Sequence, residues 1–393
     1  MKKFFLIFCL LFTALIFSAS INGQGQKGTK KLYYRHLKLN HMSPYFDYIG
    51  HYPLTAQEAK KVNHYCFTYY KNKLVSIEEK GTDYCWAIHP LLFMGAEKVC
   101  YTYTPGKRTA RYFNAKGEPS PNYKGVYVEE TTFNKRGQKV SLKYYDYKGK
   151  PMQGVWNVAE YNWDYRDSLV IEHRKNVKGD WVDVSPYFPF RVSGFKVDPV
   201  KHTIAHYNLD ENYKIINSPQ GIACYKDQEN AQGDQLNWKY YDSKGTLISP
   251  YGYSEGENIF DHQGYIVKMN FYVGNNVVGT RSFQYNKEGA VKTSTNVWNG
   301  VKQISSSEAN IHGFTIKNQK SSSIDTLQHT IKITVPKGTD LSFIVPVISV
   351  PMGAVIHPAP NVPVDFSKGC VRYTVIAANI VHSQDWMVTV NAL

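Results

Sequence analysis

The sequence predicts an all-β protein: a tandem antiparallel β-hairpin repeat array followed by a C-terminal immunoglobulin-like β-sandwich. Alternation of apolar and polar residues with period 2 dominates the chain. The 31 tyrosines and 19 phenylalanines make a strand-forming composition. A short turn signature recurs between residues 100 and 292, and beyond about residue 310 tyrosine nearly vanishes while valine, isoleucine and proline rise.

The first residues have the three-part layout of a secretory signal peptide. Lys2 and Lys3 precede an apolar run, 4–17, and small residues follow at 18–20. We therefore predict a signal peptide over residues 1–23 and an exported protein, in the periplasm, on the cell surface or secreted. The run is shorter than the ~20 residues that span a bilayer. No later stretch is longer, so we expect no transmembrane span after cleavage of the signal.

Residues 24–99 are the least repetitive part and predict an α+β segment. Thr55-Ala56-Gln57-Glu58 is a capping box, which opens a short helix. If the protein is an enzyme, its site is expected in residues 32–106, because groups able to perform chemistry gather there. They are His36, His41, His51, His64, His89, Cys66 and Cys85.

Residues 100–292 form the predicted hairpin array, through a unit that reads aromatic, Asn or Asp, two variable residues, Gly. The Asn or Asp side chain bonds the backbone two residues on, and Gly supplies a positive φ. This is the chemistry of a short hairpin loop. Gly117, Gly149 and Gly179 are spaced by 32 and 30 residues, so each period holds two hairpins. The units begin at Phe113, Phe133, Tyr145, Tyr241, Phe260 and Tyr285.

These units resemble the tandem YD-type and MORN-variant hairpin repeats of bacterial surface and secreted proteins. The resemblance covers residues 100–292 and rests on the recurrence of the unit rather than on any single copy. The following stretch, 293–310, is rich in Ser, Thr and Asn. It predicts a linker.

Residues 311–393 predict the sandwich. Ile331, Ile333 and Val335 alternate with polar residues, and a Pro-Lys-Gly-Thr-Asp turn follows at 336–340. A last alternating strand includes Trp386. The ordered pattern from Val335 to Val390 resembles the immunoglobulin-like modules of unknown function appended to exported Bacteroidetes-type proteins. The resemblance implies a spacer or accessory module beside an envelope or glycan-handling domain, and it carries over no catalytic residue.

No catalytic or metal-binding constellation stands out, and we predict no cofactor and no metal. His202 and His206 are four apart on an expected strand, about 13 Å by a ~3.3 Å rise, too far for one metal ion. The acidic stretch 227–234 is interpreted as a solvated insertion. Cys66 and Cys100 are one conceivable disulfide, the alternative being two separate buried thiols.

The partner is expected to be a glycan or an envelope protein. The net charge of +14 comes from residues scattered singly among acids, so nucleic acid is not predicted as a partner. Exposed aromatic rings stack on sugars and occur at interfaces. In the alternative interpretation, adjacent pairs such as Tyr144–Tyr145 and Tyr240–Tyr241 place one ring in the core and one on the opposite face. The candidate ligand-binding residues are Trp156, Trp163, Trp181, Trp238, Tyr145 and Tyr241.

Two functions follow from these observations. The first is an exported cell-envelope or secreted binding or scaffold protein that uses an aromatic face of the array. The alternative is a periplasmic or surface carbohydrate-active enzyme.

Overall fold

The computed structural model describes residues 28–40, 42–81 and 94–393, and almost all of its regular structure is β. The helices of this part are α1 (Ala56–Ala59) and the 3-10 turn η1 (Val155–Asn157). The predicted capping box is confirmed: the Thr55 hydroxyl accepts from the Glu58 backbone N–H, and the Glu58 carboxylate accepts from the Thr55 N–H at 2.8 Å. The predicted signal peptide, together with His41, Cys85 and His89, lies outside the described residues.

One large antiparallel sheet holds the first nineteen strands. From β3 onward each strand pairs with the next one along the chain up to β19, and β1 lies between β2 and β3. The strands are β1 (Thr29–Lys38), β2 (Ile49–Leu54), β3 (His64–Tyr70), β4 (Lys73–Lys80), β5 (Lys98–Thr104), β6 (Lys107–Phe113), β7 (Val128–Phe133), β8 (Lys139–Tyr145), β9 (Glu160–Arg166), β10 (Leu169–Lys175), β11 (Val192–Asp198), β12 (Thr203–Leu209), β13 (Cys224–Glu229), β14 (Gln235–Tyr241), β15 (Glu255–Phe260), β16 (Ile266–Val273), β17 (Asn276–Tyr285), β18 (Val291–Trp298) and β19 (Val301–Gln303).

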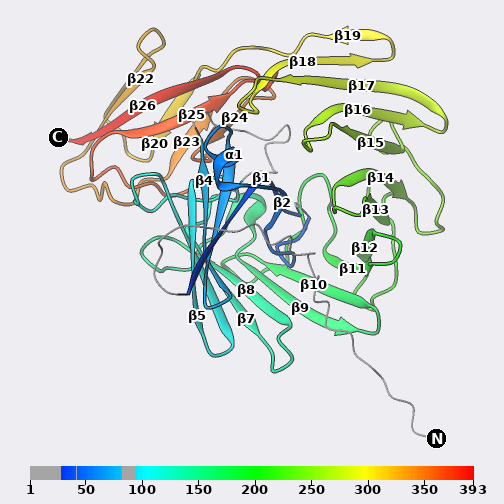
Figure 1. The fold of residues 1–393 in the computed structure, drawn as a ribbon. Helices are drawn as coiled ribbons and strands as arrows, with labels where there is room; N and C mark the ends of the chain where they lie inside the picture. Colours follow the sequence, from blue (N-terminus) through cyan, green and yellow to red (C-terminus); the bar gives the residue numbers. More distant parts are fainter. Residues whose placement is uncertain (1–27, 41, 82–93) are drawn as a thin grey trace, which may run out of the picture.

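The sheet follows a curved path rather than a plane. In Figure 1 the strands from β5 to β19 succeed one another around the molecule, and β1 and β2 lie on the inner side of the curve. Side chains of the β1–β2 hairpin accordingly contact turns far along the chain. The His36 ring nitrogen lies 3.0 Å from the Gln263 carbonyl oxygen, and the Tyr52 hydroxyl donates to Asp234 at 2.8 Å. The N-terminal hairpin therefore lies inside the curve and contacts turns on its far side.

The predicted hairpin turns are present. In the first unit the Asn114 side-chain oxygen accepts from the backbone N–H groups of Lys116 at 3.0 Å and Glu118 at 2.9 Å, and Gly117 has φ 80°. At five turns of this kind, the last residue of the strand forms a further bridge to the residue six positions on. These strand ends recur at intervals of 30 to 34 residues, so the period read from the first glycines continues through the second half. The bridges are Phe113–Pro119, Tyr145–Pro151, Lys175–Trp181, Leu209–Ile215 and Tyr241–Leu247.

The residue before each of these strand ends points inward and is buried. Each one accepts, through its backbone oxygen, the same long-range hydrogen bond from the segment after the turn, so the five positions are structurally equivalent. A second buried position lies two residues earlier on the same strand. The residues just before the strand ends are Tyr112, Tyr144, Arg174, Asn208 and Tyr240. The residues two positions earlier are Ala110, Leu142, Glu172, His206 and Trp238.

The C-terminal part is a β-sandwich. β20 (Gly313–Ile316) pairs with β23 (Pro346–Ser349), and five strands form the facing sheet. Ile331, Ile333 and Trp386 are fully buried between the two sheets. The order in the larger sheet is β21 (Ser321–Asp325), β22 (Thr330–Val335), β26 (Ser383–Ala392), β25 (Val371–Ile376), β24 (Val355–His357).

The sandwich packs against the beginning of the array and joins the two ends of the curve (Figure 1). The buried Tyr127 hydroxyl donates to the Pro363 carbonyl oxygen at 2.6 Å. Lys148 forms an ion pair with Asp340 at 3.1 Å. The β18–β19 hairpin carries the array's pairing to Gln303, and a short connection leads from there into the sandwich.

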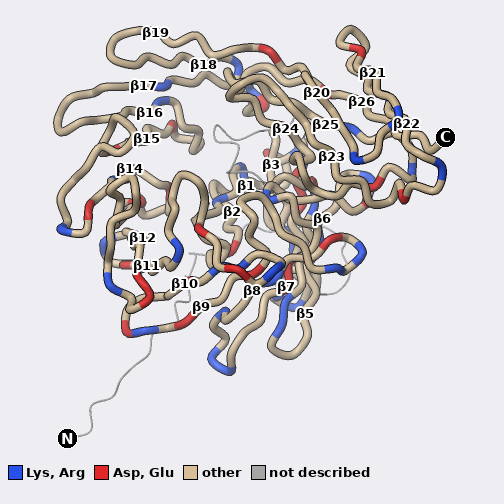
Figure 2. The backbone as a smooth tube through the Cα atoms, turned by 180° about the vertical axis from the view of Figure 1, so that it is seen from behind, with Lys and Arg blue, Asp and Glu red and all other residues tan. Residues whose placement is uncertain are grey.

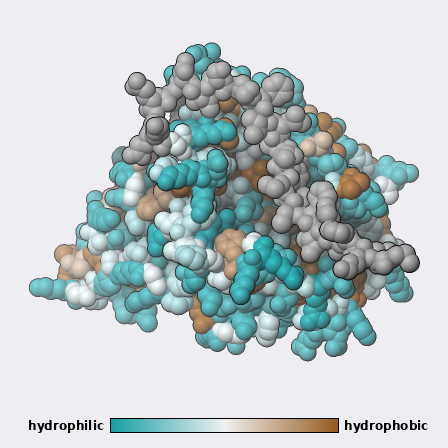
Figure 3. Space-filling model, turned by 60° about the horizontal axis from the view of Figure 1, so that its bottom comes forward, coloured by the Kyte–Doolittle hydropathy of each residue, from teal (hydrophilic) through white to brown (hydrophobic). Residues whose placement is uncertain are grey.

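Charged residues of both signs are spread over the molecule. Figure 2 shows Lys and Arg interspersed with Asp and Glu, and the face in Figure 3 is largely hydrophilic with apolar residues in small groups. Such a surface is typical of a solvated protein. In the part of the chain that the structure describes, no helix is long and apolar enough to cross a membrane.

Candidate functional site

A cavity of about 980 Å³ lies on the inner side of the curved sheet. This volume is at the upper end of the range that small-molecule sites occupy. Its longest wall is the inner face of β13 to β17. Side chains alternate across a strand, so each of these strands contributes residues of its inner face, and bulges in β14 and β16 shift the alternation by one residue. The residues contributed are Tyr225, Asp227, Glu229, Gln235, Trp238, Tyr240, Asn258, Phe260, Ile266, Met269, Phe271, Arg281 and Tyr285.

Three other segments complete the enclosure. The end of β1 with its following residues, 35–40, forms the opposite wall, and residues 184–188 after β10 form a third side. Residues 353–355 of the sandwich also line the cavity, as does Trp156. Trp156 has φ 65°, a left-handed conformation that a bulky side chain rarely adopts. Such strain persists where the surrounding structure imposes it, and it is frequent at binding sites.

Aromatic rings dominate the long wall. Tyr240 packs edge-on against Tyr251 and Tyr253 with ring centroids 5.6 and 5.7 Å away, and Trp238 meets Phe271 at 6.1 Å. Trp238 lies on the backbone of Gly256, where an added Cβ would come within 2.0 Å of the indole. Glycine is required there, because any side chain would lift the ring from the neighbouring strand. The wall is thus a preformed apolar surface for a flat ligand.

Polar groups gather at the strand ends near β1. Glu229 forms a short ion pair with Lys38. Asp234 accepts from Tyr52 and lies 3.3 Å from the His51 ring nitrogen. Burial lowers the pKa of His36 to about 4, so this imidazole is neutral at pH 7. The cavity therefore combines stacking surfaces with a cluster of hydrogen-bonding groups.

Asp227 is the most perturbed carboxyl group of this cluster. It is 5% exposed, and burial raises its pKa to about 7, although Gln235 and Tyr225 donate hydrogen bonds to it. Asp234 is also buried. The interpretation of residues 227–234 as a solvated insertion is therefore wrong at these two positions. Between them, Ala231 and Gln232 are exposed.

We expect Asp227→Asn to remove part of the pH dependence of stability. The free carboxyl titrates near 4 in the unfolded chain, whereas folding raises its pKa to about 7. Because the folded pKa is the higher one, wild-type stability from this group is present below pH 4 and is lost as pH rises to 7. Relative to wild type, the variant should gain about 4 kcal/mol between pH 4 and pH 8, at about 1.4 kcal/mol for each unit of the pKa difference. Urea unfolding at several pH values measures this difference, and parallel curves for the two proteins would contradict it.

The structure separates the candidate aromatic residues into three settings. Trp156 and Trp238 line the cavity. Trp163 is 2% exposed and donates to Glu172 at 2.8 Å within the core. Trp181 is 46% exposed and packs on His173 of the outer face. The two tyrosine pairs divide as the alternative interpretation expects, with Tyr144 and Tyr240 buried inside and Tyr145 and Tyr241 on the opposite face.

Other predicted groups do not converge. Cys66 and Cys100 are free thiols, with β4 between their strands. His202 is exposed in a turn while His206 is buried. Among residues 28–40, 42–81 and 94–393, no three His, Cys, Asp or Glu side chains could hold a metal ion together.

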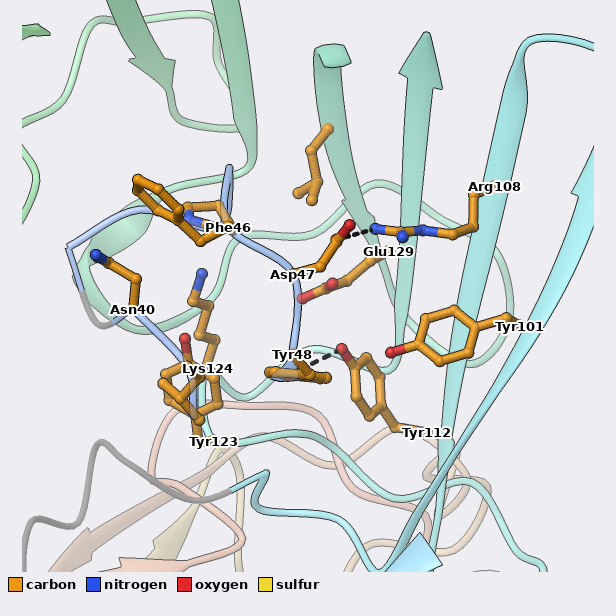
Figure 4. Close-up of a pocket in the computed structure, with 13 residues that line it drawn as sticks. Asn40, Phe46, Asp47, Tyr48, Tyr101, Arg108, Tyr112, Tyr123, Lys124 and Glu129 are labelled. Atoms are coloured by element: carbon orange, nitrogen blue, oxygen red, sulfur yellow. Dashed lines mark hydrogen bonds and ion pairs between the residues drawn. The ribbon is translucent and has the colours of Figure 1, made fainter. Parts of the chain in front are cut away.

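A second, much smaller pocket of about 30 Å³ lies between the segment 39–48 and strands β5 to β8 (Figure 4). Asp47 accepts from Arg108 at 2.6 Å and from Lys139 at 2.7 Å. Burial raises the pKa of the Asp47 carboxyl, but the two cations outweigh this and hold it well below its usual range. This volume has room for one or two water molecules but is too small for a sugar. This cluster therefore ties the segment after β1 to the array.

Comparison with known proteins identifies one segment. The family model described as "SGBP, N-terminal" matches residues 311–390, which form the sandwich, and it fits the Bacteroidetes-type module predicted there. Comparison with curated proteins gave no match. A solved structure from Bacteroides thetaiotaomicron VPI-5482, named a candidate glycoside hydrolase, is 28% identical over 23% of this chain and 27% of that chain, with a TM-score of 0.21. The sandwich is thus the segment of this chain that a family model describes.

Proposed function

We propose that this is an exported cell-envelope or secreted protein that binds a glycan in the cavity between β1 and strands β13 to β17. The observation that carries the proposal is the combination of an aromatic wall with buried hydrogen-bonding groups at its end. Sugars present apolar ring faces and polar edges, so their sites need both kinds of contact. The match of residues 311–390 to a family of glycan-binding-protein modules supports the same ligand class.

The proposed site is not the aromatic face of the array that the sequence predicts. It uses Trp156 and Trp238 of the candidate residues and adds Tyr187, Tyr251 and Tyr253. Tyr187 is 63% exposed and its backbone oxygen accepts from the Tyr251 hydroxyl. An exposed ring at the rim of an aromatic cavity is a suitable first contact for a sugar.

We expect Tyr187→Ala and Trp156→Ala each to weaken glycan binding about 10-fold, because each removes a stacking surface of roughly 1.4 kcal/mol. Binding is measured by isothermal titration calorimetry after a glycan array has identified a ligand. Trp181→Ala is the matched control, since Trp181 is an exposed indole outside the cavity. Equal losses in all three variants would contradict the proposed location, and an array without any bound glycan would contradict the function.

A carbohydrate-active enzyme remains the second candidate, because two carboxyl groups in different surroundings line this cavity. Asp227 has the raised pKa of an acid, and Glu229, two residues on along β13, is paired with Lys38. Both side chains line the cavity, and inverting glycosidases use such a pair of carboxyl groups, one as acid and one as base. Product analysis of the bound glycans after incubation separates the candidates: released sugars favour the enzyme, and unchanged glycans the binding protein.

A further inference from the structure

Two arginines line the cavity, and the acid on which Arg35 acts is Glu58, whose carboxyl pKa is lowered by hydrogen bonds from Thr55 and, to a smaller extent, by Arg35. Arg281 comes from the middle of β17, and Arg35 comes from β1 on the opposite wall. Neither forms an ion pair within the described ranges 28–40, 42–81 and 94–393. A guanidinium group is always charged, and it is costly to bury without an acceptor.

Arg281 is the better defined of the two. Its Nε atom is buried and has no hydrogen-bond partner in the described part of the chain. The guanidinium carbon lies 5.3 Å from the centroid of the Phe283 ring, which packs against the cation but accepts no conventional hydrogen bond. Burial lowers the pKa of this group, which reflects the loss of water around it. The side chain is therefore held in the cavity with unused donor capacity.

Arg35 faces the same region through a pair of tyrosines. Its guanidinium lies 5.8 Å from the Tyr265 ring centroid and donates a long hydrogen bond of 3.4 Å to the Tyr265 hydroxyl. The Tyr265 and Tyr285 rings pack 4.6 Å apart, and Tyr285 lies on the same strand as Arg281. The tyrosine pair thus links Arg35 to the strand that carries Arg281.

The carboxylates of the cavity are already engaged elsewhere. Glu229 is bound by Lys38, and Asp234 by Tyr52 and His51. The cavity therefore has an end where acids are paired and a region where, among the described residues, the Arg281 guanidinium has a buried donor without an acceptor. Arginine binds carboxylate and sulfate groups through two parallel hydrogen bonds, which gives both affinity and orientation.

We propose that Arg281 and Arg35 form a subsite for an anionic substituent of the bound glycan, the carboxylate of a uronic acid or a sulfate ester. The sugar ring would stack on Tyr265 and Tyr285 while its charged group meets the guanidinium groups. This inference rests on the proposed glycan-binding function. It adds that acidic glycans are selected over neutral ones.

The test compares three sets of oligosaccharides on the wild-type protein: uronic acid oligomers, their neutral methyl esters, and sulfated oligomers. We expect acidic forms to bind at least 10-fold more tightly than the methyl esters, and this preference to fall between 50 and 500 mM NaCl. Preference for carboxylate or for sulfate identifies the group. Binding of neutral and acidic forms with equal affinity would overturn the subsite but leave the proposed function, whereas no binding of any class would overturn both.

Variants test the residues. Arg281→Gln should weaken binding of the acidic ligand about 10- to 100-fold, as expected for charge-assisted hydrogen bonds, and leave any neutral ligand within about 3-fold. Arg136→Gln is the control, because it removes the same charge from an exposed hairpin turn. Equal weakening by both variants would assign the effect to net charge and overturn the subsite. Thermal melting of each variant verifies that the array remains folded.

Discussion

Replacing Arg174 by methionine is expected to lower the free energy of unfolding by about 3–5 kcal/mol, the cost of leaving a buried charge without its partner. Arg174 and Glu172 form a short ion pair, and their side chains are 0% and 1% exposed. Arg174 also donates to the Phe190 carbonyl oxygen at 2.6 Å and to the Ser193 hydroxyl at 2.9 Å. In the variant, these acceptors and the Glu172 carboxylate would remain buried without their donor.

The repeat suggests a more specific test of this ion pair. Arg174 stands where the neighbouring repeats bury Tyr144 and Tyr112, and Glu172 stands where the preceding one buries Leu142. The double variant Glu172→Leu/Arg174→Tyr restores the apolar pattern. It should be more stable than either single variant, because no buried charge is left and apolar replacement of buried pairs is often neutral.

Urea unfolding of the wild type, both single variants and the double variant measures these differences. Full recovery is not expected, since Ser43 and Trp163 also donate to Glu172 and would lose their acceptor. A loss of unfolding free energy in the double variant equal to the sum of the two single losses would contradict this expectation. Such a loss would show that the pair is not coupled.

The turns and strands of the array could be predicted from the sequence because each depends on residues that are close together in the chain. An Asn or Asp followed three residues later by Gly specifies its own turn, as Asn114 and Gly117 show. Alternation and the capping box at Thr55 act over similarly short distances. Curvature, however, is the sum of small twists over many strands, and no single residue encodes it. Whether the array is flat or closed therefore required the structure.

The site depended on that curvature. Lys38 meets Glu229, and Tyr52 meets Asp234, across more than 180 residues of chain. From the sequence, residues 227–234 have the composition of a solvated loop, and nothing local reveals that β1 covers them. Tyr187 and Arg281 likewise lie in no sequence motif that indicates a binding site. One signal was available: Gly256 in a strand that otherwise reads as regular indicates a close approach, here by Trp238.

Trp386→Ala is the second variant with a large expected effect. Trp386 is 0% exposed at the centre of the sandwich, and its indole N–H donates to the Ala309 carbonyl oxygen at 3.1 Å. Truncation of a buried tryptophan costs about 3–5 kcal/mol, a large part of the 5–15 kcal/mol that stabilises a typical domain. Limited proteolysis and thermal denaturation should therefore show the sandwich opening first. Met387→Ala is the control, since this neighbour points outward and is 41% exposed.

The same variant separates two locations for the glycan site. The family match lies in the sandwich, whereas the proposed cavity takes only residues 353–355 from it and the rest from the array. If the cavity binds the glycan, Trp386→Ala should keep its affinity within about 10-fold under conditions in which the array stays folded, because β1 and β13 to β17 remain in place. Loss of all binding with an intact array, and no effect of Tyr187→Ala, would move the site into the sandwich. The array would then be the scaffold and the sandwich the binding module.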